Sequence, residues 1–149
     1  MRKLLFMLMV AMPFMSFAQV QNPVKWSFTA NKTADMTYEI HLTATIANGW
    51  HIYSQTTPEG GPSATSILFS KNPLLLVSGD VKEVGKLEKH HEPLFGVDVK
   101  QFSDKVDFVQ IVKVKGNAKT AVKGSLDFMV CDNKQCLPPQ TVEFSVSLK

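Results

Sequence analysis

Cys131 and Cys136 are the residues of this 149-residue chain that are best suited to covalent chemistry. They are its only cysteines, and they lie in the stretch CDNKQCLPPQ, residues 131–140. Four polar residues separate them, and a Leu-Pro-Pro run follows the second one. Thiols at this spacing suit a structural disulfide, a metal site or a reversible redox pair.

The N-terminus indicates the compartment in which these thiols work. The chain opens with Arg2 and Lys3, and an almost unbroken apolar run follows over residues 4–14. Ser16 and Ala18 are small residues at the positions that a signal peptidase reads, which predicts cleavage before Gln19. A membrane anchor is the alternative, but the run is shorter than the roughly 20 residues of a spanning helix. We therefore expect a signal peptide over residues 1–18 and an exported domain over residues 19–149.

Charge and composition exclude several functions for the mature domain. Loss of Arg2 and Lys3 with the leader lowers the formal charge from +3 to +1. A nearly neutral domain lacks the basic surface that binds nucleic acid or an anionic membrane. No second apolar run approaches spanning length, so we expect the mature protein not to span a membrane. In an oxidising compartment, two cysteines can persist as a disulfide.

Alternating apolar and polar residues predict an all-β fold. Residues 38–46 and 142–148 each place an apolar residue at every second position, which is typical of half-buried strands. Short apolar stretches bounded by turn residues predict further strands at residues 26–28, 67–69, 74–77, 106–114 and 126–130. Seven or more short strands in a domain of this length favour an immunoglobulin-like antiparallel β-sandwich. In this interpretation, Trp50 belongs to the core.

The cysteines flank a short polar loop between two of these predicted strands. Such a position can bring their α-carbons to the roughly 5.5 Å that a disulfide requires. The closed ring is small, so the bridge contributes little to stability. We expect a local bridge exposed at the surface, which another thiolate can reach. The position alone leaves open whether it is a reactive pair or a structural hairpin disulfide.

A metal site is the third alternative, with His90 and His91 as further ligands. The histidines lie about forty residues upstream, in what we take to be a separate loop, and the spacing matches no standard zinc finger. Adjacent side chains of an extended segment also point in opposite directions. We therefore expect neither a metal nor a cofactor.

Three stretches together resemble the N-terminal periplasmic domain of the thiol:disulfide interchange protein DsbD. They are NGWHIYS at residues 48–54, HHEPLFG at 90–96 and CDNKQCLPP at 131–139. The order and separation of these stretches match the family, and the similarity extends from about Trp26 to the end of the chain. The family fold is an immunoglobulin-like sandwich, in agreement with the strand pattern.

The resemblance implies a function in electron relay. Domains of this family take reducing equivalents from a membrane-embedded donor and pass them to periplasmic thioredoxin-like oxidoreductases by thiol–disulfide exchange. Cys136 matches the cysteine that forms the mixed disulfide with a partner, and Cys131 matches its resolving cysteine.

The resemblance also implies supporting residues around the two cysteines. A cap loop carries an aromatic residue over the disulfide; Phe95 is the candidate here, with Leu94 beside it. Glu92 matches the acidic cap positions, and His51 and Tyr53 match side chains beside the cysteines. A core position for Phe95 is the alternative to a lid.

Two classes of function remain compatible with the sequence. The first is a redox relay through Cys131 and Cys136. The second is an exported structural or ligand-binding sandwich in which the disulfide only fixes a hairpin. Reversible reduction of a domain that stays folded would favour the relay.

Overall fold

A computed structural model describes residues 22–117 and 119–148. The expected leader, residues 1–18, lies outside these residues. The described chain forms nine strands: β1 (Val24–Ala34), β2 (Thr37–Ile46), β3 (His51–Tyr53), β4 (Ser66–Phe69), β5 (Leu75–Glu92), β6 (Val97–Val114), β7 (Thr120–Phe128), β8 (Val130–Cys131) and β9 (Gln140–Leu148). Within the same residues, nothing forms a helix long and apolar enough to cross a bilayer.

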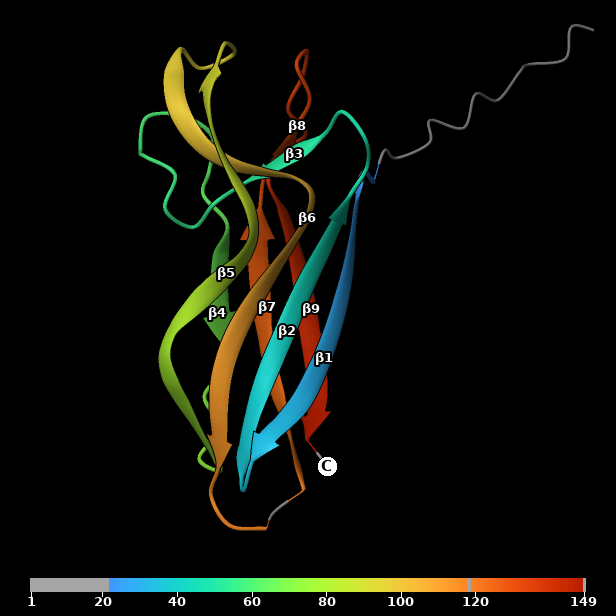
Figure 1. Cartoon of the computed structure of the whole chain (residues 1–149), viewed down its shortest axis with the longest axis vertical. Coiled ribbons are helices and arrows are strands. Elements are labelled where there is room, and N and C mark those ends of the chain that lie inside the picture. Colours follow the sequence, from blue (N-terminus) through green and yellow to red (C-terminus); the bar gives the residue numbers. More distant parts are fainter. Residues whose placement is uncertain (1–21, 118, 149) are drawn as a thin grey trace, which may run out of the picture.

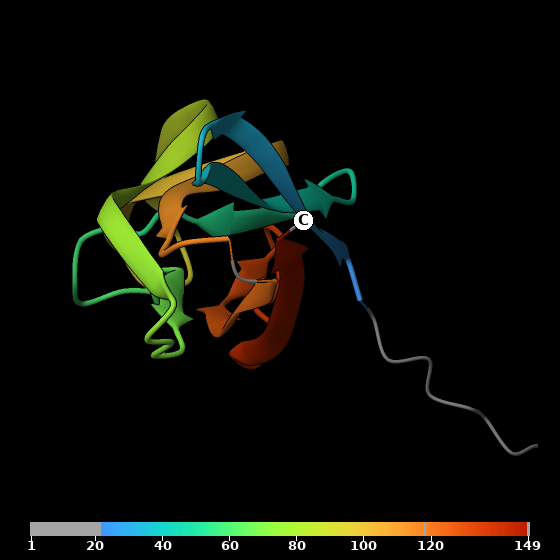
Figure 2. The ribbon, with the colours of Figure 1, turned by 90° about the horizontal axis from the view of Figure 1, so that it is seen from below.

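The strands form two antiparallel sheets that pack face to face. The larger sheet has the order β1-β2-β6-β3-β8, and β5 pairs along β6 as well. The smaller sheet has the order β4-β7-β9. Figure 2, which looks along the strands, shows the two sheets as two layers. The predicted immunoglobulin-like sandwich is confirmed.

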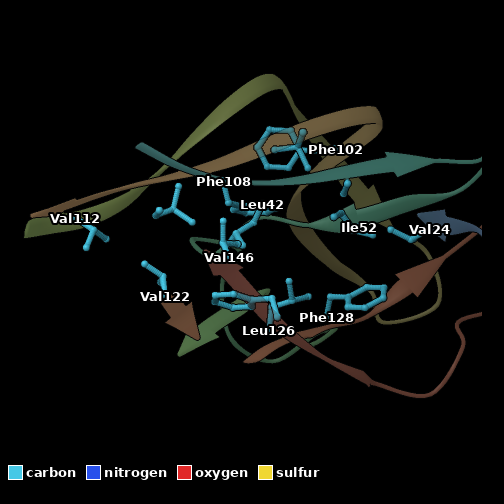
Figure 3. Close-up of a cluster of buried hydrophobic side chains, with 14 of the residues drawn as sticks. Val24, Leu42, Ile52, Phe102, Phe108, Val112, Val122, Leu126, Phe128 and Val146 are labelled. Carbon is cyan, nitrogen blue, oxygen red and sulfur yellow. The ribbon is translucent and has the colours of Figure 1, made fainter. Parts of the chain in front are cut away.

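The main core lies between the two sheets, as the alternating sequence pattern predicts. The inward residues of β2, from Tyr38 to Ile46, are all buried. In β9, Phe144, Val146 and Leu148 are buried, and Val142 is partly buried against them. Figure 3 shows side chains from both layers meeting, among them Leu42 and Phe108 from one sheet and Leu126 and Val146 from the other. Trp50 packs against this core, as expected.

The pair β5 and β6 departs from the prediction of short strands. Each has 18 residues, and they pair from Leu75 with Val114 to Glu92 with Val97. We call this hairpin the arm. Most of β5 is exposed, so backbone hydrogen bonds rather than an apolar face hold it to β6. The sequence of β5 therefore lacks the apolar alternation by which the other strands were predicted.

Candidate functional site

The two cysteines form a disulfide across a tight hairpin at one end of the sandwich. The Leu137 amide donates to the Val130 carbonyl and the Asp132 amide to the Gln135 carbonyl, each at 2.9 Å. The cysteines lie opposite each other between these two bonds, in a non-hydrogen-bonded pair of an antiparallel bridge. Their α-carbons are 4.0 Å apart, closer than the roughly 5.5 Å that we expected, because opposite residues of such a pair approach most closely.

The two sulfur-bearing residues differ in burial. Cys131 is fully buried, with 0% of its surface exposed, whereas Cys136 is only partly buried. The expectation of an exposed bridge is therefore wrong for Cys131. It is buried because strand β8 pairs with β3 on one side and with the Cys136 segment on the other. Cys136 is therefore the more accessible of the two cysteines.

Strand β3 places two predicted site residues beside Cys131. His51 lies directly opposite Cys131 in the ladder between β3 and β8, so the two side chains share one face of the sheet. Tyr53 lies two residues further along β3 and therefore faces the same way. Ile52, between them, points to the opposite face and joins the main core. The sequence NGWHIYS thus directs His51 and Tyr53 to the cysteines, and Trp50 and Ile52 to the main core.

Glu92, at the end of β5, joins this group through its carboxylate. The Tyr53 hydroxyl donates to Glu92 Oε2 at 2.9 Å. His51 Nε2 lies 3.3 Å from the same oxygen and 3.1 Å from the Tyr53 hydroxyl. With the hydroxyl proton directed to Glu92, the tautomer that satisfies these contacts carries its proton on His51 Nε2. Glu92 is 1% exposed, so the three side chains form a buried polar network next to Cys131.

Burial shifts the titration of two members of this network. It lowers the pKa of His51 below its ordinary value of 6.5, although Glu92 opposes part of this effect. It also raises the pKa of Tyr53, and Glu92 adds to that shift. His51 is therefore a neutral imidazole at neutral pH, and Tyr53 keeps its proton.

A small hydrophobic cluster surrounds the buried cysteine. Tyr53, Val99 and Cys131 are its buried members, and Val97, Met129 and Cys136 pack against them partly buried. We call it the second cluster. It lies on the face of the larger sheet that points away from the main core, because its β3 and β8 residues alternate with Ile52 and Val130 of that core.

The loop of residues 54–65 joins β3 to β4, and it contacts both the second cluster and the arm. The Thr65 hydroxyl donates to the Tyr53 carbonyl at 2.5 Å. Gly61 lies against Val97 of the arm so closely that a Cβ added there would be 2.5 Å from Val97 Cγ2. A residue with a side chain would push the loop and the arm apart at this point.

The expected cap residues lie at the tip of the arm. The Phe95 and Gly96 amides donate to the Glu92 carbonyl, at 3.2 and 2.8 Å, which closes the turn. Leu94 is 46% exposed and Phe95 is 39% exposed, so neither is a core residue. Figure 1 shows the tip of the arm at the same end of the molecule as the β8 hairpin. Their function as a lid stays a prediction, because both lie outside the buried second cluster.

Asp132 shapes the loop between the cysteines. Its carboxylate accepts the backbone amides of Lys134 and Gln135, each at 2.7 Å. These two bonds lower the pKa of Asp132, which is therefore ionised at neutral pH. The same bonds hold the polar loop in a tight turn and bring the two cysteines opposite each other.

His90 and His91 lie in strand β5, not in the separate loop that we expected. Successive residues of a strand face opposite sides. His91 Nδ1 contacts Asp98 at 2.9 Å on the exposed side of the arm. Within the ranges that the structure describes, no three His, Cys, Asp or Glu side chains come together as a metal site.

The sequence did not predict that the arm and the residue after β7 contribute to the second cluster. Val97, Val99 and Met129 were assigned no function, although they contact the site. The alternation in Val97-Asp98-Val99 was a usable signal, because both valines face the cluster. Met129 carried no periodic signal, since it lies between the strands β7 and β8.

An immunoglobulin-like sandwich with a local disulfide at one end defines the general class of this domain. A sequence profile described as thiol:disulfide interchange protein DsbD, N-terminal, matches residues 18–148. The chain therefore belongs to the DsbD N-terminal domain family, which relays electrons by thiol–disulfide exchange. A search of curated protein sequences finds no significant match.

Two solved structures share the fold. One is the reduced N-terminal domain of Neisseria meningitidis DsbD, with a TM-score of 0.55, 18% identity, and coverage of 84% of this chain and 85% of that one. The other is the N-terminal periplasmic domain of ScsB from Proteus mirabilis, with a TM-score of 0.53 and 21% identity. The match covers 84% of this chain but only 44% of the ScsB chain.

Proposed function

We propose that this domain relays electrons in the periplasm by reversible oxidation and reduction of Cys131 and Cys136. It accepts reducing equivalents from a membrane-embedded donor and passes them to periplasmic thioredoxin-like oxidoreductases through transient mixed disulfides. In this proposal, residues 1–18 are a leader cleaved before Gln19, and residues 19–149 are the working domain. Membership of the DsbD N-terminal family supports it.

The unequal burial of the two cysteines is the observation that carries the proposal. Cys136 is partly exposed and forms the mixed disulfide with a partner. Cys131 is buried and acts as the resolving cysteine, which attacks Cys136 and releases the partner. A bridge with one accessible sulfur restricts exchange to one position, as a relay requires.

The surrounding residues have supporting functions in this proposal. Leu94 and Phe95 form a cap that limits access to the disulfide in the absence of a partner. Glu92 fixes the base of that cap to β3 through its bonds with His51 and Tyr53. A hydrophobic cap protects the reduced thiols from small oxidants.

A redox titration of the mature domain tests the proposal. Oxidised protein is equilibrated with dithiothreitol or glutathione, and free thiols are counted while circular dichroism follows the fold. A relay gives two reversible thiols in a domain that stays folded. Failure to equilibrate, or unfolding on reduction, contradicts the proposal.

The full burial of Cys131 favours one alternative, a structural hairpin disulfide. In that case, the bridge resists reduction or its loss destabilises the domain strongly. The same titration separates the two functions, because only the relay gives rapid and reversible exchange with a folded product.

A further inference from the structure

We infer that His51 is the proton acceptor for Cys131 when that cysteine resolves a mixed disulfide, and that Glu92 and Tyr53 are its positioning residues. This inference rests on the proposed function and adds a specific step to it. The three residues follow the order of a Cys-His-carboxylate series, because His51 is the cross-strand partner of Cys131 and also contacts the buried Glu92.

The register of the strands is the first observation that supports this step. His51 is the cross-strand partner of Cys131, and the two side chains share one face. Directly opposite residues have Cβ atoms about 4.5–5.5 Å apart, within the reach of an imidazole and a thiol. Cys131 has 0% exposure, so water cannot readily take its proton. A base inside the protein is therefore needed at this position.

The hydrogen bonds of the imidazole are the second observation. His51 Nε2 contacts Glu92 Oε2 and the Tyr53 hydroxyl, at 3.3 and 3.1 Å. With the proton on Nε2, the lone pair lies on Nδ1, which is thus the nitrogen able to accept a proton. The buried Glu92 carboxylate stabilises the imidazolium that forms, in the way that a carboxylate orients and stabilises histidine in catalytic triads.

The charges around His51 agree with the function of a neutral base. Burial lowers the pKa of His51, so the imidazole is unprotonated at neutral pH before the step begins. The titratable groups that act on it, apart from the thiol itself, are Tyr53 of its own strand, Glu92 and His90 of β5, and Asp132 after β8. Glu92 and Asp132 both favour the imidazolium once a proton arrives.

The step balances in atoms and electrons. At its start, Cys136 is joined to the sulfur of an oxidised partner protein, and Cys131 is a thiol. His51 Nδ1 takes the proton of Cys131, and the resulting thiolate attacks the sulfur of Cys136. The bond between Cys131 and Cys136 forms, the bond to the partner breaks, and the partner sulfur leaves as a thiolate with the electron pair. The proton on His51 then passes to that thiolate or to solvent.

Stopped-flow reaction of the reduced mature domain with dithiobis(nitrobenzoate) tests the inference. The first nitrothiobenzoate is released when Cys136 attacks, at a rate proportional to reagent concentration. The second is released when Cys131 closes the disulfide, at a rate independent of reagent. Both phases are followed by absorbance across a pH series, for the wild type, His51→Gln and Glu92→Gln.

The inference makes specific predictions for these rates. His51→Gln slows the second phase at least about tenfold near pH 7, because an unassisted thiol is only a few per cent thiolate there. The deficit narrows as the pH rises toward 10, above the ordinary thiol pKa of about 8.5, because hydroxide then competes with His51 for the proton of the buried thiol. Glu92→Gln slows the same phase by a smaller factor with the same pH dependence. The first phase stays within about twofold in both variants, because it depends on Cys136.

His41→Gln is the matched control. His41 also bonds a carboxylate, Asp107 at 2.7 Å, but it lies opposite Val109 in the register of β2 and β6. Both phases should equal those of the wild type.

Each other outcome has a defined meaning. An unchanged second phase in His51→Gln, or a slowing of equal size at every pH, overturns the inference and leaves the relay intact. Absence of both phases in the wild type overturns the relay itself. If His51→Gln does not fold, Glu92→Gln and an NMR titration of His51 in reduced wild type and in Cys131→Ser decide. An identical His51 titration in those two proteins overturns the inference.

Discussion

The two faces of the larger sheet carry two different kinds of interior. Among the described residues, the main core has 19 buried hydrophobic members, drawn from both sheets. The second cluster has three, and next to them lie the buried polar side chains of His51 and Glu92. The first interior is apolar and extensive, and the second is small and has polar neighbours. In the proposed function, stability and reactivity therefore lie on opposite faces of one sheet, and substitutions on one face should affect the other little.

The largest effect on stability should come from the main core. Phe108 is fully buried between the sheets, so Phe108→Ala should lower the free energy of unfolding by about 3–5 kcal/mol. Urea unfolding of the oxidised protein measures this loss. Leu68→Ala is the control, because Leu68 is 70% exposed, and it should change stability by less than about 0.5 kcal/mol. Equal losses in the two variants would mean that the burial of Phe108 between the sheets does not stabilise the fold.

Removal of the disulfide should have a smaller effect. The ring closed by Cys131 and Cys136 spans a sequence separation of 5, for which loop entropy gives about 2 kcal/mol. The variant Cys131→Ala/Cys136→Ala should keep the sheet signal in circular dichroism and lose no more than that amount. An unfolded double variant would mean that the second cluster holds the fold together after all.

The pH dependence of stability should show the contribution of His51. Burial lowers its pKa in the folded state, so the unfolded chain binds more protons at pH values between the folded pKa and 6.5. The contribution of neutral His51 to stability is complete above pH 6.5 and is lost as the pH falls through the pKa of His51 in the folded state. Each unit by which folding lowers this pKa corresponds to about 1.4 kcal/mol of stability. Urea unfolding near pH 5 and pH 7.5 should show a greater acid loss for the wild type than for His51→Gln. Equal losses would contradict this assignment.

Only a small effect on stability is expected at the tip of the arm. Leu94 and Phe95 are exposed, so Leu94→Ala/Phe95→Ala should cost less than about 1 kcal/mol. If the two side chains cover the disulfide, the same variant should react faster with small thiols. Exchange rates and melting temperature are measured together. A large drop in melting temperature with an unchanged exchange rate would show that the two side chains do not act as a lid.

The main core was predictable because its strands each have a polar and an apolar face. Residues 38–46 alternate, and the structure buries every second one. The arm was not predictable in the same way. Strand β5 is mostly exposed, so its residues do not alternate between apolar and polar. The sequence therefore does not indicate that this segment pairs with the long strand β6.

The candidate site was predictable in its residues but not in its geometry. The cysteines, His51, Tyr53 and Glu92 were all named from sequence and resemblance. Their shared face depends on the register of β3, β8 and β5, which arises from long-range pairing. The burial of Cys131 also follows from that pairing, so the local polar loop suggested exposure incorrectly.

The contact at Gly61 has a mechanical consequence for the arm. Strand β3 pairs directly with β6 of the arm, from His51 with Ser103 to Tyr53 with Gln101. The Glu92 bonds and the Gly61–Val97 contact add two attachments nearer the tip. Because strand pairing fixes the rest of the arm, loss of one of these two attachments leaves the other in place. A double variant at Glu92 and Gly61 should therefore loosen the tip by more than the sum of the single variants. A bound partner would have to release both attachments to move the tip, while the rest of the arm stays paired with β3.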